Sequence, residues 1–236
     1  MRVACLATVV MAALVVANPT ARAAESSACS PALCTGAHAL QFEIGYDFKL
    51  SPFQGATLSY ERFLRDRLAL RLGIGASMMY EDDERAVDFE GDTEARGEID
   101  LTNWYHQYSL VCQLVSYQGG PVALYYGAGP KVTYSNERQE RVWFSGYGEV
   151  LESHGSIWWR RAWGVGVAGV AGVQWLVSDR FALHAEYSTA LMYRHDDETL
   201  TSVMSGENYR VMKETDERSA VGVYPDGTRL GLSVFF

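Results

Sequence analysis

The sequence predicts an all-β fold, an eight-stranded antiparallel up-and-down transmembrane β-barrel, and three observations support this. Apolar and polar residues alternate with a period of two in eight segments. The connections between these segments are short at one end and mostly long at the other. The apolar face carries about thirty large side chains, whereas the interior of an eight-stranded barrel is only just wide enough to be filled by side chains. We therefore expect the apolar face to point outward into lipid, where a closed barrel pairs every backbone group, and not inward as in a soluble lipocalin-like barrel.

The amino terminus predicts export. Residues 1–23 place Arg2 before an apolar run from Val3 to Val16 and end in the small-x-small pattern of a signal peptide. A retained anchor helix is the alternative, but this run is shorter than the roughly 20 residues that a span requires. Residues 24–38 would then form a short segment before the barrel, and the mature chain would carry 18 basic and 29 acidic side chains. Such an acidic chain is a poor partner for nucleic acid.

The strands follow from the alternation. The clearest segment, ALQFEIGYDFK, places apolar residues at even positions from Leu40 to Phe48 and mostly polar residues at odd positions, and the second segment is the weakest. The last segment is RLGLSVFF. The eight expected strands cover residues 39–49, 54–64, 68–78, 104–114, 122–132, 163–175, 181–193 and 229–236.

The connections separate the two ends of the barrel. Short turns are expected at 65–67, 118–121 and 178–180, and long polar loops at 81–103, 135–162 and 195–227. One further connection, 51–53, is short, and no helix is needed after the signal. Aromatic residues near the strand ends predict two interfacial girdles: Tyr80, Trp104, Tyr134, Trp163 and Tyr193 toward the loops, and Tyr117, Trp175, Phe181 and Phe236 toward the turns.

Residues 39–236 resemble a known family. The alternation, the turn asymmetry, the phrases LSYERFLRDRLALRLGIG and RFALHAEYS, and the terminal aromatic are similar to the small outer-membrane barrels of Gram-negative bacteria, the OmpA-like, OmpX-like and opacity-protein group. The resemblance implies periplasmic turns, extracellular loops, and a role for Phe236 in the signal that the barrel-assembly machinery recognises. OmpA proper continues into a peptidoglycan-binding domain, which is not implied here because the chain ends with its last strand.

Charged residues are expected to meet inside the barrel. A hairpin symmetric about Asp66 places Glu61 opposite Arg71 on the inner face, and opposite charges on facing strands attract. Glu43 lies at a similar depth on the first strand. With His184 and Glu186, these residues predict an internal polar network that plugs the barrel; a gated proton or ion path is the alternative.

A catalytic site is weighed against this network. His184, Glu186 and Ser188 share one face and supply the residue types of a nucleophile, its base and an orienting acid. Some outer-membrane barrels are enzymes on lipid A, including a deacylase with a His, Ser and Glu site. Here the trio faces the lumen and begins near the periplasmic turn at Asp179, away from the outer leaflet, and its order and spacing differ from the deacylase pattern. We therefore expect no catalytic residue and no cofactor.

The long loops hold two further candidate sites. Residues 81–100 contain ten acidic side chains, but they lack the strict spacing of a calcium loop, so only a weak divalent-cation site is indicated. Its residues would be Asp88, Glu90, Asp92 and Glu94. The middle loop is rich in aromatics that either pack on one another as a cap or contact a partner or lipopolysaccharide: Trp143, Phe144, Tyr147, Trp158 and Trp159.

Two cysteines near the start of the expected mature chain are a candidate pair. Cys29 and Cys34 could form a disulfide in an oxidising compartment, and Cys112 is expected to act as a small hydrophobe.

We expect a monomeric, non-enzymatic outer-membrane protein whose loops serve envelope integrity, adhesion or surface interaction. Its expected partners are outer-membrane lipid, lipopolysaccharide, the assembly machinery and an unidentified extracellular partner. A lipid-modifying enzyme and a narrow solute or ion pore are the alternatives.

Overall fold

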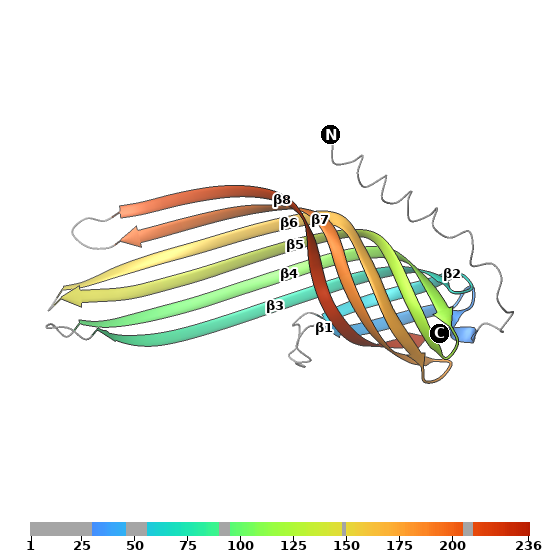
Figure 1. Cartoon of the computed structure of the whole chain (residues 1–236). Helices are drawn as coiled ribbons and strands as arrows, with labels where there is room; N and C mark the ends of the chain where they lie inside the picture. Colours follow the sequence, from blue (N-terminus) through green and yellow to red (C-terminus); the bar gives the residue numbers. More distant parts are fainter. Residues whose placement is uncertain (1–29, 46–55, 90–94, 148–149, 205–209) are drawn as a thin grey trace.

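The computed structural model describes residues 30–45, 56–89, 95–147, 150–204 and 210–236; within these, the side chains of 84–99 and 143–153 are not described. Its eight strands form one closed antiparallel barrel in sequence order, which confirms the predicted fold class (Figure 1). β1 closes the barrel against β8, with Ala39 opposite Phe235 and Gly45 opposite Arg229. The strands are β1 (His38–Gly45), β2 (Ala56–Arg65), β3 (Leu68–Phe89), β4 (Ala95–Gly119), β5 (Val122–Tyr147), β6 (Val150–Leu176), β7 (Phe181–Met204) and β8 (Arg210–Phe235).

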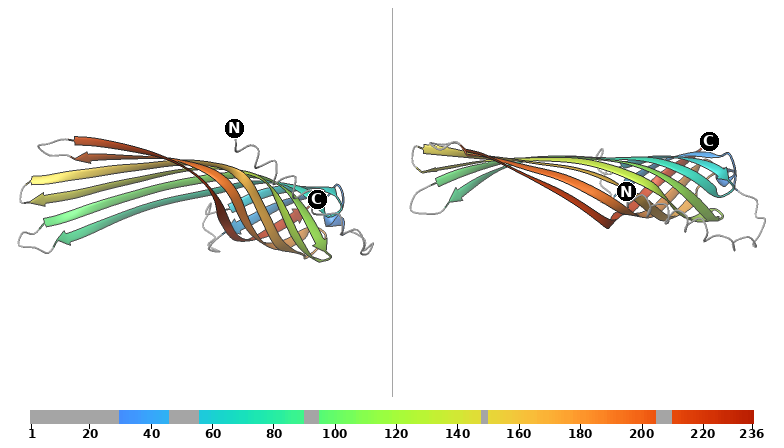
Figure 2. Two further views of the ribbon diagram at one scale, coloured as in Figure 1. Left: turned by 45° about the horizontal axis from the view of Figure 1, so that its top comes forward. Right: turned by 90° about the horizontal axis from the view of Figure 1, so that it is seen from above.

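Six strands continue far beyond the barrel. The segments 81–103, 135–162 and 195–227 were expected to be loops, but the structure shows most of them as paired strand. They form a curved sheet that projects from one end of the barrel (Figures 1 and 2). The expectation was wrong because this sheet mixes polar residues with scattered apolar ones such as Leu200 and Met212. The regular hydrophobic alternation therefore ends at the barrel rim, although the backbone pairing does not. We call this region the projecting sheet.

The barrel is apolar outside and polar inside. Ile74 and Leu110 are more than half exposed, whereas Glu61 and Arg71 are almost fully buried. The loop-side aromatics Tyr80, Trp104, Tyr134 and Trp163 are exposed on the outer face, and so are Trp175, Phe181 and Phe236 at the turn end. Tyr117 was expected in the turn-side girdle and is instead 2% exposed inside the barrel. Its odd number already gives it the parity of the lumen-facing Gln113 and Val115.

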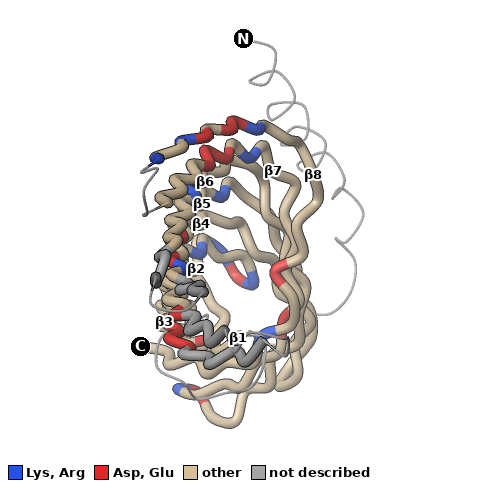
Figure 3. The backbone as a smooth tube through the Cα atoms, turned by 90° about the vertical axis from the view of Figure 1, so that its left-hand side faces the viewer, with Lys and Arg blue, Asp and Glu red and all other residues tan. Residues whose placement is uncertain are grey.

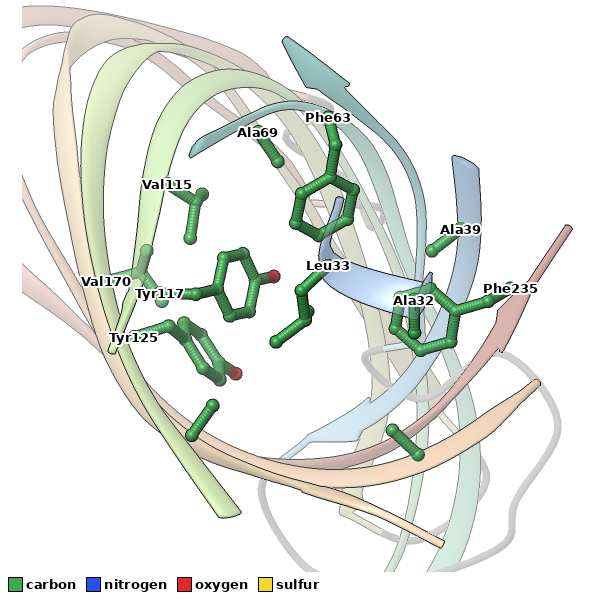
Figure 4. Packing of buried hydrophobic residues seen from close by; sticks show 12 residues of the cluster. Ala32, Leu33, Ala39, Phe63, Ala69, Val115, Tyr117, Tyr125, Val170 and Phe235 are labelled. Atoms are coloured by element: carbon green, nitrogen blue, oxygen red, sulfur yellow. The ribbon is translucent and has the colours of Figure 1, made fainter. Parts of the chain in front are cut away.

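A short helix occupies the turn end of the lumen, where none was expected. η1 (Pro31–Leu33) is a 3₁₀ turn that begins at Pro31, whose fixed φ and missing N–H suit a helix start. It places Ala32 and Leu33 among Phe63, Tyr117 and other buried residues (Figure 4). Within the described residues, no helix is long and apolar enough to cross a membrane.

Small residues leave room for the large side chains in the lumen. Gly172 on β6 is such a residue, and a substitution there tests this role. A Cβ atom at Gly172 would lie 2.5 Å from Tyr125 Cζ and 2.6 Å from the Ala185 carbonyl oxygen. We expect Gly172→Ala to lower the free energy of unfolding by about 1–3 kcal/mol, the usual cost of overpacking. Urea titration in lipid vesicles measures the change. The control is Gly155→Ala on the same strand, where a Cβ meets nothing within 4 Å; equal losses in both variants would contradict the argument.

The turn between β2 and β3 is tied to the segment after η1. Asp66 Oδ1 accepts hydrogen bonds from the backbone N–H of Thr35 at 2.9 Å and from its hydroxyl at 2.8 Å. The backbone bond is the larger cause that holds the pKa of Asp66 below its ordinary value of 3.8. A lowered pKa stabilises the folded protein above the unfolded-state pKa, and this contribution is lost as the pH falls through the folded-state pKa.

We therefore expect Asp66→Asn to be less stable than the wild type at pH 7 and to approach it as the pH falls below 3.8. Unfolding curves at a series of pH values measure this difference. Thr35→Val removes only the hydroxyl donor and should reproduce part of the effect. A difference between wild type and Asp66→Asn that stays constant across the acidic range would refute the role of this carboxylate.

Candidate functional site

Arg71 lies at the centre of the lumen. Its side chain projects inward from β3 opposite Glu61 of β2, and Arg71 Nε donates to Glu61 Oε1 at 2.6 Å. On the other side, Arg71 Nη1 donates to Glu186 Oε2 at 2.7 Å, which connects β3 to β7 across the barrel. The guanidinium also lies 5.2 Å from the ring centroid of Tyr125. Because all three charged groups are buried, removing the cation would leave two carboxylates without compensation.

Two tyrosines complete the bonding of these carboxylates. The Tyr117 hydroxyl lies 2.8 Å from both carboxylate oxygens of Glu61, and the Tyr125 hydroxyl donates to Glu186 Oε2 at 3.1 Å. The ring centroids of Tyr117 and Tyr125 are 5.3 Å apart. Neither tyrosine is among the lumen residues predicted from the sequence. Their positions on the polar face of β4 and β5 were the signal that could have found them.

Glu43 belongs to a neighbouring cluster and does not contact Arg71 through a hydrogen bond. Its carboxylate lies 3.4 Å from His184 Nε2 and 3.4 Å from Arg229 Nη1. The other ring nitrogen of His184 is 3.1 Å from the Ser233 hydroxyl. The five expected network residues therefore divide into two groups, Glu61 with Arg71 and Glu186, and Glu43 with His184.

A third cluster lies nearer the end of the barrel from which the sheet projects. Lys131 Nζ is 2.6 Å from Asp226, and the Ser188 hydroxyl donates to the same carboxylate at 3.3 Å. Among the described hydrogen bonds, Ser188 is joined to Asp226 and His184 to Ser233, so neither His184 nor Glu186 is placed against the Ser188 hydroxyl. The residue types of a catalytic trio are present, but the geometry of a relay is not.

The space that remains between these groups is small. A cavity of about 20 Å³ is bordered by residues of all three clusters, including Glu43, Arg71, Lys131 and Asp226. That volume holds about one water molecule. The cavity is therefore too small for a solute larger than water, and polar side chains border it.

The turn end of the lumen is closed by apolar contacts. Phe63 packs against Tyr117 with ring centroids 5.4 Å apart and against Phe235 at 6.5 Å, and Leu33 of η1 joins this cluster. The backbone holds η1 in place, because the Arg67 N–H donates to the Leu33 carbonyl at 2.9 Å. We refer to η1 with Phe63, Tyr117 and Phe235 as the plug.

The remaining predicted sites lie elsewhere or outside the described residues. Trp158 and Trp159 lie on opposite faces of β6: the Trp158 indole N–H donates to Glu198, and the Trp159 ring lies 5.1 Å from Arg138 Cζ and 5.5 Å from Arg161 Cζ. The side chains of Trp143, Phe144, Tyr147 and Asp88 fall outside the description, as do Glu90, Asp92 and Glu94.

Two predictions concern the chain ends. Phe236 exchanges both backbone hydrogen bonds with His38 of β1, at 3.1 and 3.0 Å, so the last residue is fixed in the closing seam. Its ring stacks on His38 at 5.9 Å. The Cys34 thiol donates to the Ser30 carbonyl at 3.1 Å. Cys29 lies outside the described residues, and its pairing with Cys34 stays a prediction.

The fold and the site together define a closed eight-stranded barrel with an apolar exterior and a charged, plugged interior. Its structure matches a major outer membrane protein of Thermus thermophilus with 13% identity and a TM-score of 0.41, over 85% of this chain and 99% of that chain. OprG of Pseudomonas aeruginosa matches with 12% identity and a TM-score of 0.41, over 86% and 97%. Ail, the attachment invasion locus protein of Yersinia pestis, matches with 14% identity and a TM-score of 0.36, over 86% and 99%.

Two of these neighbours, the Thermus thermophilus protein and OprG, are outer-membrane proteins. No family model and no curated protein matches the sequence.

Proposed function

We propose that this protein is a non-enzymatic outer-membrane barrel that uses its projecting sheet for surface interaction, such as adhesion or envelope support. The observation that carries the proposal is a lumen filled by ion pairs and a plug beneath a large sheet that extends past the aromatic girdle. A filled lumen supports anchoring more than transport. The sheet is then the part of the molecule that is available to partners.

The exterior supports a membrane location. Exposed apolar side chains surround the barrel, and a closed barrel satisfies all backbone groups in lipid. Tyr80 and Trp104 pack edge to face at 5.1 Å where the apolar surface ends, and Trp163 packs beside Tyr193 at 5.6 Å. Aromatic residues favour such interfaces. In the proposed orientation, the projecting sheet lies outside the cell and the plug faces the periplasm.

The test separates the proposed function from its two alternatives. The mature chain is refolded in detergent micelles, where a folded barrel migrates differently on a gel before and after boiling. Bilayer conductance then tests for a pore, and mass spectrometry of lipid A from expressing cells tests for an enzyme. We expect no channel openings and no change in lipid mass, together with binding of expressing cells to host or envelope components that is lost when the projecting sheet is shortened. Regular channel openings, a modified lipid A, or cell binding that persists without the sheet would overturn the proposal.

A further inference from the structure

We propose that the projecting sheet binds one divalent transition-metal ion, such as Zn²⁺, through His195, Asp197 and Glu217. His195 and Asp197 are two residues apart on β7 and therefore share a face, and Glu217 of β8 is directly opposite Asp197. One ligand atom from each of the three residues lies within 4.8 Å of the others. Ligand atoms 2.0–2.2 Å from one ion are about 3.3–3.6 Å apart in a tetrahedral site, so small rotations of these side chains would bring all three ligand atoms onto one ion.

The imidazole of His195 is held in the orientation that a metal ligand needs. Its Nδ1 is hydrogen-bonded to the Ser219 hydroxyl at 2.8 Å, and its ring packs against Trp163 with centroids 5.6 Å apart. Nε2 is left facing the acidic side and lies 3.0 Å from Asp197 Oδ1. A hydrogen bond to the second ring nitrogen is the usual way in which a protein orients a ligating histidine.

The charges also favour a cation. Like charges directly opposite on neighbouring strands repel each other, and Asp197 and Glu217 form such a pair. Arg161 of β6 lies opposite Asp197 on its other side and offsets part of this repulsion. Among the ion pairs of the described residues, none includes Glu217. Figure 3 shows acidic and basic residues together on the projecting parts of β7 and β8.

The donor set indicates the class of metal. An imidazole nitrogen suits zinc, copper, nickel and iron, whereas calcium and magnesium prefer sites made of oxygen alone. Three protein ligands leave a coordination position open for water or for a group from outside. Because His195 and Asp197 are partly exposed, an ion can enter from solvent.

The test uses the whole mature chain, refolded in detergent micelles, treated with a chelator and titrated calorimetrically with ZnCl₂. We expect one ion per chain. His195→Ala and Glu217→Gln should each weaken binding by at least about tenfold, and Ser219→Ala by about tenfold through the misoriented imidazole. The matched control is Asp216→Asn, because Asp216 neighbours Glu217 but pairs with Arg218 at 2.6 Å; its affinity should be unchanged.

A second readout guards against adventitious binding. Co²⁺ should give a visible absorption band in the wild type that His195→Ala removes, while both proteins keep the gel shift of a folded barrel. Absence of Zn²⁺ binding, binding that His195→Ala leaves unchanged, or equal effects of Asp216→Asn and Glu217→Gln would overturn the proposal. These outcomes do not depend on whether the protein acts at the cell surface.

Discussion

Arg71→Met is expected to lower the free energy of unfolding by about 3–5 kcal/mol, the cost of removing one partner from a buried ion pair. The guanidinium is the shared partner of Glu61 and Glu186, at 2.6 and 2.7 Å, and all three residues are buried. Its loss leaves two carboxylates facing the lumen without their cation. Urea unfolding in lipid vesicles, followed by tryptophan fluorescence, measures the change.

Two further variants separate burial from charge. Arg138→Met removes an exposed partner of Glu140 on the projecting sheet and should cost less than about 1 kcal/mol. The second variant is a triple substitution that combines Glu61→Gln and Glu186→Gln with Arg71→Met. It removes the uncompensated charges and should recover much of the lost free energy of unfolding. A wild-type unfolding midpoint for Arg71→Met would show that these pairs do not hold the barrel together.

The barrel was predictable because its physical signal is local. Period-two alternation identifies each strand, and the volume of the apolar side chains decides which face points outward. The symmetry of the hairpin about Asp66 also places Glu61 opposite Arg71, as in the structure. Parity alone assigned His184 and Glu186 to the lumen, where both are buried.

The other features of the structure could not be predicted in this way. The pairing inside the lumen and the position of η1 depend on contacts between residues far apart in the sequence, which the alternation does not encode. Glu186 reaches Arg71 rather than Arg229, its cross-strand neighbour, because the lumen is narrow enough for side chains to cross it. η1 enters the barrel through a backbone bond to Arg67 and the contacts of Leu33, and no periodic pattern marks such a segment. The projecting sheet was missed because its strands are stabilised by pairing without a buried apolar face.

Tyr117→Ala is expected to disturb both parts of the structure that close the lumen, the ion-pair network and the plug. The Tyr117 hydroxyl bonds Glu61 in the ion-pair network, and the ring packs on Phe63 in the plug. Loss of a buried aromatic ring costs about 3–5 kcal/mol, so the variant should unfold at a lower urea concentration. We also expect it to show channel openings in a planar bilayer, because the cavity beside Arg71 would then join the space left by the ring.

Tyr117→Phe separates these two contributions. It keeps the ring against Phe63 and loses only the hydroxyl bonds to Glu61, which cost about 1.5–3 kcal/mol when the acceptor is charged. This variant should be less stable than the wild type but electrically silent, since the plug still fills the turn end. Openings in Tyr117→Phe would place the barrier to ions in the network alone, whereas silence in Tyr117→Ala would place it in η1 and Phe63. The comparison therefore locates the barrier along the axis of the barrel.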